Sequence, residues 1–79
     1  MIIGIDMGRA RLVAHERRRA LREAEFAPLD HQVVVALADP ERLQAAEGRR
    51  QAVRKRFAEM QSKIDQAETP AQLIAIVAP

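Results

Sequence analysis

Apolar residues return at steps of three and four along the second half of the chain. The series runs from Leu43 to Ala67 in steps of 3, 4, 3, 4, 3, 4 and 3 residues, and Arg50 is its one polar member. This spacing is typical of one face of an α-helix. We therefore predict a helix over 40–67 whose core side chains include Leu43, Ala46, Val53, Phe57, Met60 and Ile64.

A weaker apolar stripe runs through the first half of the chain. Asp6 stands where a helix N-cap is expected, and Gly8 is the only helix-weakening residue between positions 7 and 25. Further on, Pro28 lacks the N–H that an interior helical residue donates. We predict a helix over 7–37 with a kink or short break near Pro28.

Two further proline signals divide the chain. Asp39-Pro40 and Thr69-Pro70 each combine an N-cap residue with a proline at the first helical position. The first leaves a link of only two residues between helices of roughly 46 and 42 Å, at about 1.5 Å per residue. These helices should form an antiparallel hairpin, followed by a short helix over 70–78. The predicted fold is all-α, in a single domain over 1–79.

Spare apolar residues lie at both ends of the chain. Residues 1–5 predict a strand-like extended tip that is too short to be stable alone. The hairpin would bring this tip to the same pole as the helix over 70–78, and an exposed apolar patch usually marks a protein interface. We expect docking and oligomerisation there, through Ile2, Ile3, Ile5, Leu73, Ile76 and Val77.

The composition favours helices and supplies few large side chains for a hydrophobic core. Alanine fills 15 of the 79 positions, whereas the aromatic residues are two phenylalanines and cysteine is absent. A chain of this size buries only roughly 60% of its unfolded surface, so a partner would add stability. No apolar run approaches the roughly 20 residues of a membrane span, and the N-terminus does not have the pattern of a signal peptide. We expect a soluble protein with no membrane partner.

Candidate chemistry is sparse. His15-Glu16 begins like the metal-binding helix of a zinc protease, but Arg19 stands where that motif requires a second histidine. Ser62 is the only serine and has no base near it in sequence, and the three glycines form no phosphate-binding loop. We expect no enzymatic activity, no cofactor and no metal.

Charge is high and nearly balanced. Thirteen Lys and Arg against eleven Asp and Glu give a net charge of +2, with an isoelectric point near 9.9. Arginines cluster in 17–22 and 49–56, with glutamates three or four residues away, which favours ion pairing within and between the helices. The pairs expected are Glu16 with Arg19, Glu59 with Lys63, and Glu23 and Glu25 with Arg54 and Arg56.

Two other interpretations of the arginines stay open. One is contact with an acidic protein surface. The other is nucleic-acid binding, whose single-stranded form is further disfavoured because the chain has few aromatic residues on which bases could stack. Nucleic-acid binding would require an unpaired surface formed by Arg17, Arg18, Arg22, Arg50 and Arg54.

Four stretches occur in a distinctive order. They are Ile5-Asp6-Met7, the basic run 15–19 with Arg-Glu-Ala-Glu-Phe-Ala-Pro-Leu-Asp at 22–30, the segments 50–54 and 57–61, and Ile-Asp-x-Ala-x-Thr-Pro-x-x-Leu at 64–73. In this order the chain resembles small helical proteins of tail gene clusters in bacteriophages and prophages of proteobacteria. It departs from them at 37–40, where the relatives often carry an Ile-Pro-Gly turn.

The resemblance implies a context. Members of that group resemble tail-associated proteins, either minor components of the tail tip, baseplate or fibres, or chaperones of their assembly. The expectation is a non-enzymatic structural part of the virion tail, made in the host cytoplasm and bound to other tail proteins and to copies of itself. The alternatives are a cytosolic tail-fibre chaperone, or a small phage regulator that binds host protein or nucleic acid through its arginines.

Overall fold

The computed structural model describes residues 6–78 of the chain. Three helices make up this part: α1 (Met7–Val35), α2 (Pro40–Gln66) and α3 (Pro70–Val77). No strand occurs within residues 6–78, so the predicted all-α class is confirmed for this part of the chain. The strand-like tip expected at 1–5 lies outside the described residues.

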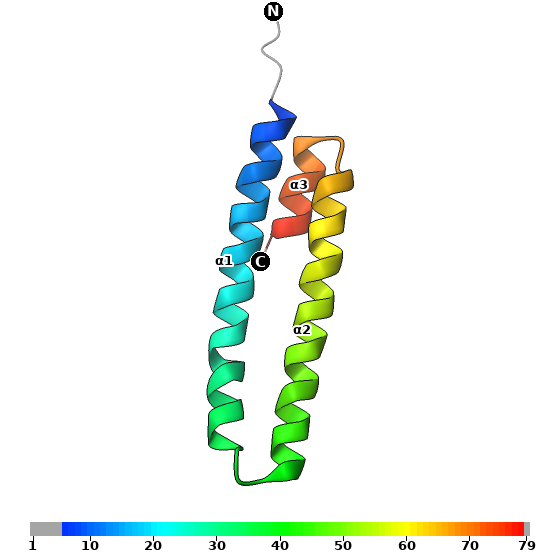
Figure 1. Ribbon diagram of the computed structural model, residues 1–79. Coiled ribbons are helices and arrows are strands. Elements are labelled where there is room, and N and C mark those ends of the chain that lie inside the picture. The colour runs from blue at the N-terminus through cyan, green and yellow to red at the C-terminus, as the bar shows by residue number, and fades with distance from the viewer. Residues whose placement is uncertain (1–5, 79) are drawn as a thin grey trace, which may run out of the picture.

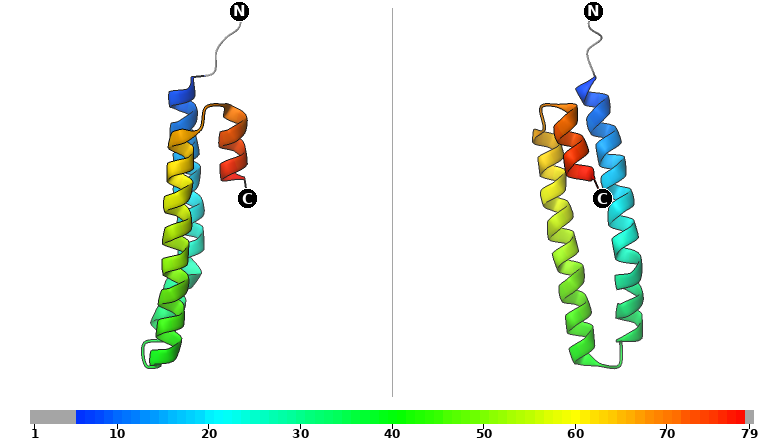
Figure 2. Two further views of the ribbon diagram at one scale, coloured as in Figure 1. Left: turned by 90° about the vertical axis from the view of Figure 1, so that its right-hand side faces the viewer. Right: turned by 180° about the vertical axis from the view of Figure 1, so that it is seen from behind.

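The two long helices lie side by side and run in opposite directions (Figure 1). Their 29 and 27 residues correspond to about 44 and 40 Å of helix. After α2 the chain turns back, and α3 packs against both long helices on one side of the pair (Figure 2). The molecule is therefore a three-helix bundle at the α3 end and a pair of helices over the rest of its length.

Each helix begins at the side-chain cap that its sequence predicts. The Asp6 carboxylate accepts a backbone N–H of the first turn of α1 at 3.1 Å. Asp39 accepts two backbone N–H groups at the start of α2, at 3.1 and 3.3 Å. Thr69 and Gln72 form a reciprocal capping box at the start of α3. These caps satisfy N–H groups that have no acceptor inside the helix.

Helix α1 passes through Pro28 without a break, so the short break that the sequence allowed as an alternative to a kink does not occur. Proline removes the hydrogen bond to the carbonyl of Ala24, and Ala24 is exposed, so water can replace the lost donor. The helix ends at Val35, two residues before the predicted end. The N–H of Ala36 contacts three preceding carbonyls, and its own carbonyl accepts from the N–H of Asp39 at 2.9 Å.

The main core lies where the three helices meet. Ile64 is fully buried there, in a cluster with Ala14, Ala67 and Leu73. Partly buried residues pack around this cluster: Met7, Ala10, Met60, Ile76 and Val77. Toward the α1–α2 turn, where no third helix covers the pair, the buried residues are Phe26, Ala36, Ala46 and Phe57.

The six side chains expected to face the core along α2 differ in burial. Ala46, Phe57 and Ile64 are buried, whereas Leu43, Val53 and Met60 are half-buried. At Leu43 and Val53 a single facing helix shields only one side of the α2 stripe, so these two side chains stay partly open to water.

Candidate functional site

An apolar groove of about 410 Å³ lies between α1 and α3. We call it the α1–α3 groove. Val13 and Ile74 line it and are 57% and 69% exposed. Among the described residues the lining consists of Ala10, Val13, Ala14, Arg17, Pro70, Leu73, Ile74 and Val77, and Arg17 is its only charged member. Contiguous apolar surface of this kind is typical of a contact with another protein.

The structure corrects part of the predicted docking set. Leu73 is only 4% exposed, and Ile76 and Val77 are half-buried, because α3 folds back onto the long helices. These side chains pack in the core of the chain itself, and Leu73 has little surface left for a partner, although it and Val77 line the floor of the α1–α3 groove. The large apolar side chain of α3 that is exposed is Ile74, which was not among the predicted docking residues. Ile74 follows Leu73 and therefore points about 100° away from it around the helix. If Leu73 faces the core, this offset predicts that Ile74 faces outward.

The other predicted docking residues are in the N-terminal segment. Ile2, Ile3 and Ile5 lie outside the described residues. Their docking stays a prediction.

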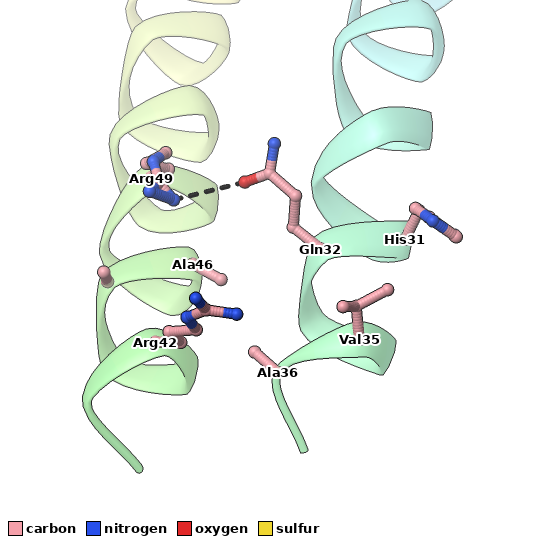
Figure 3. Close-up of a pocket in the computed structure, with 8 residues that line it drawn as sticks. His31, Gln32, Val35, Ala36, Arg42, Ala46 and Arg49 are labelled. Carbon is pink, nitrogen blue, oxygen red and sulfur yellow. Dashed lines mark hydrogen bonds between the residues drawn. The ribbon is translucent and has the colours of Figure 1, made fainter. Parts of the chain in front are cut away.

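A second group of exposed apolar side chains lies beside the α1–α2 turn. Val34, Val35 and Leu37 are between 63% and 66% exposed. An open pocket of about 420 Å³ lies next to them, between the ends of α1 and α2 (Figure 3). Arg49 spans this pocket and donates a hydrogen bond to Gln32 at 3.2 Å. No carboxylate lines the pocket, so its residues provide no acid–base pair.

His15 joins the two long helices. Its Nε2 lies 2.8 Å from Oδ1 of Asp65, and Arg18 donates to its Nδ1 at 3.2 Å. Since Nδ1 accepts from Arg18, the ring proton belongs on Nε2, where the Asp65 carboxylate accepts it. Both ring nitrogens are therefore engaged. Within residues 6–78, no group of three or more His, Asp or Glu side chains is placed to hold a metal ion.

Ion pairs of the arginines connect α1 to α2. Glu25 pairs with Arg56 across the helices, as expected from the sequence. Arg50 pairs with Asp30 of α1 at 3.1 Å and with Glu47 of its own helix at 2.8 Å.

Three other expected pairs do not form in the described part of the chain. They are Glu16 with Arg19, Glu59 with Lys63, and Glu23 with Arg54. All are between exposed or partly exposed side chains, and such pairs contribute little free energy against the entropy of ordering two long side chains.

The arginines required for nucleic-acid binding do not form one unpaired surface. Arg17 lines the α1–α3 groove, Arg18 is bonded to His15, and Arg50 is held by two carboxylates. Arg22 and Arg54 do meet, at a second groove between α1 and α2, where both guanidinium groups lie over the ring of Phe26.

Comparison of the chain with protein-family models, curated proteins and solved structures finds no match. In residues 6–78, none of the helices combines the length and apolar character needed to cross a membrane.

Proposed function

We propose that this chain is a non-enzymatic helical packing module, and that copies of it associate through the α1–α3 groove. The antiparallel hairpin of α1 and α2 is the rigid part, and α3 completes the packing face. The exposure of Val13 and Ile74 on both sides of one apolar groove is the observation that carries this proposal.

The energetics of the exposed side chains favour burial against another subunit. Covering a Val or Ile side chain contributes about 1.5–3 kcal/mol, and Val13 and Ile74 are both more than half exposed. In a two-fold arrangement the same face serves both copies, so Ile74 of each copy would fill the groove of the other.

The oligomeric state of the full chain tests this proposal. Sedimentation velocity should find concentration-dependent association of the unmodified chain. The double variant Val13→Asp/Ile74→Asp should be monomeric and keep its helical circular dichroism, because a buried carboxylate at this interface is costly.

A matched control uses the exposed apolar residues at the opposite end of the molecule. The variant Val34→Asp/Leu37→Asp makes the same chemical change and should associate like the unmodified chain. A monomeric unmodified chain, or equal loss of association in both double variants, would refute the α1–α3 groove as the interface.

We further propose that the assembly is a bacteriophage tail, in which the chain is a minor structural component. The support is the ordered resemblance of the four sequence stretches to tail-associated proteins. Mass spectrometry of purified particles, produced by the bacterium that encodes the chain, should detect it. Its absence from particles would refute the structural role and support a cytosolic assembly chaperone.

The predicted contact with a neighbouring tail protein involves residues 1–5. Replacing Ile3 and Ile5 by Asp should leave helicity intact and abolish binding to the tail protein. Retained binding in this variant would show that the tip is not the docking segment.

A further inference from the structure

A second groove, of about 690 Å³, lies between α1 and α2 around Phe26. We call it the arginine groove. Its lining includes four arginines, Arg19 and Arg22 from α1 and Arg50 and Arg54 from α2. It lies at residues 19–30 of α1, further along the helix than the α1–α3 groove.

The charge of the arginine groove is incompletely balanced. Arg50 is engaged by Asp30 and Glu47. Among the described residues, Arg19, Arg22 and Arg54 have no carboxylate within 4.0 Å. Arg54 does donate a hydrogen bond to Gln51 at 2.9 Å, but that acceptor is uncharged. The groove therefore holds an excess of positive charge.

Arg22 and Arg54 approach one ring from two helices. Their guanidinium carbons lie 4.6 and 5.9 Å from the centre of the Phe26 ring, so they are at most about 10.5 Å apart. Two like charges at this separation repel each other, and an anion between them turns that repulsion into attraction. The contact with the ring also restricts each guanidinium group, which lowers the entropy lost when it binds a ligand.

We infer that the arginine groove binds a short acidic peptide segment of a partner protein, with carboxylates accepting from Arg22 and Arg54. A guanidinium group that lies over a ring still presents N–H groups along its edge, where a carboxylate accepts two of them. Two acidic residues two positions apart in an extended segment are about 6.6 Å apart. With the reach of their side chains, they can contact two guanidinium groups that are at most about 10.5 Å apart.

The lining favours a peptide over nucleic acid. Glu23 and Asp30 also face the groove and would repel a continuous phosphate backbone. Phe26 is only 9% exposed and is covered by the guanidinium groups, so it offers no open face on which a base could stack. A peptide can instead place a few carboxylates near the arginines and neutral groups near the acidic residues.

Binding of a fluorescently labelled hexapeptide of alternating Glu and Ala to the full chain, followed by fluorescence anisotropy at about 50 mM salt, tests this inference. The variant Arg22→Gln/Arg54→Gln should weaken binding by at least about tenfold. The control Arg9→Gln/Arg49→Gln removes the same charge from the same two helices outside the groove. It should change affinity by less than about threefold.

Several outcomes would overturn the inference. One is the absence of peptide binding by the unmodified chain, and another is equal loss of binding in the two glutamine variants. A third is tighter binding of a DNA duplex of about 20 base pairs that depends on Arg22 and Arg54, which would assign the groove to nucleic acid.

Two further variants separate folding and self-association from peptide binding. Arg22→Lys/Arg54→Lys keeps the charge but loses the planar fork, so it should bind the peptide more weakly than the unmodified chain while remaining folded. Undiminished binding by this variant would contradict the geometry proposed for the carboxylates. Val13→Asp/Ile74→Asp should bind the peptide normally, because the arginine groove is built by one chain.

Discussion

The guanidinium group of Arg11 donates a hydrogen bond from Nη2 to the backbone carbonyl of Ala67 at 2.8 Å. The two residues are 56 positions apart in the sequence. Ala67 follows the last residue of α2 and is buried where the chain turns toward α3. A side chain of α1 therefore fixes the connection between the other two helices, near the negative end of the α2 dipole.

Replacing Arg11 by Ala should lower the free energy of unfolding by about 1–2 kcal/mol. The substitution leaves the buried Ala67 carbonyl without its charged donor. Thermal and urea unfolding followed by circular dichroism would measure the change. Arg9→Ala is the matched control, because the Arg9 side chain is exposed on the same helix and forms no ion pair or hydrogen bond among the described residues. Equal unfolding curves for the two variants would refute the role of Arg11.

Ile64→Ala should be among the most destabilising single substitutions in the chain. Ile64 is fully buried at the point where all three helices meet, so the change loses apolar burial and leaves a cavity, at a cost of about 2–4 kcal/mol. Leu12→Ala removes a similar side chain that is 65% exposed, and it should cost less than about 1 kcal/mol. Urea unfolding would distinguish them, and a smaller loss for Ile64→Ala than for Leu12→Ala would contradict the described core.

Gly48→Ala should stabilise the protein by about 0.5–1 kcal/mol, because alanine loses less backbone entropy in a helix. A Cβ atom at position 48 meets nothing within 4 Å. Gly8→Ala is the contrasting variant, since its Cβ would lie 3.2 Å from Oδ1 of Asp6, the cap of α1. We expect a raised melting temperature for Gly48→Ala and a smaller gain, or a loss, for Gly8→Ala. A gain for Gly8→Ala that equals the gain for Gly48→Ala would count against a tight cap at Asp6.

Thr69→Ala should loosen α3 and cost about 1 kcal/mol. The Thr69 hydroxyl accepts the N–H of Gln72 at 3.2 Å, and alanine has no such acceptor. Hydrogen exchange should become faster for the amides of 70–77 than for those of the long helices. Thr69→Ser retains the hydroxyl and should exchange like the unmodified chain. Unchanged exchange in Thr69→Ala would show that packing of Leu73 alone holds α3.

The sequence alone determined where the helices begin. Asp6, Asp39 and Thr69 cap backbone groups only two or three residues away, so the signal is local and can be read from neighbouring positions. The core positions Phe57 and Ile64 could likewise be predicted from the sequence, because the period of an α-helix decides which side chains share a face.

Only the tertiary structure decided which surfaces remain exposed. The fold of α3 against the long helices buries Leu73 and exposes Ile74, although the two are adjacent in an apolar run. The contacts of Arg11 with Ala67 and of His15 with Asp65 join residues at least 50 positions apart. Such contacts depend on how whole helices pack, and packing is set by the combined burial of many side chains. The spacing of residues along one helix does not encode this packing. Each groove is formed by two helices together, and the sequence of either helix alone does not predict it.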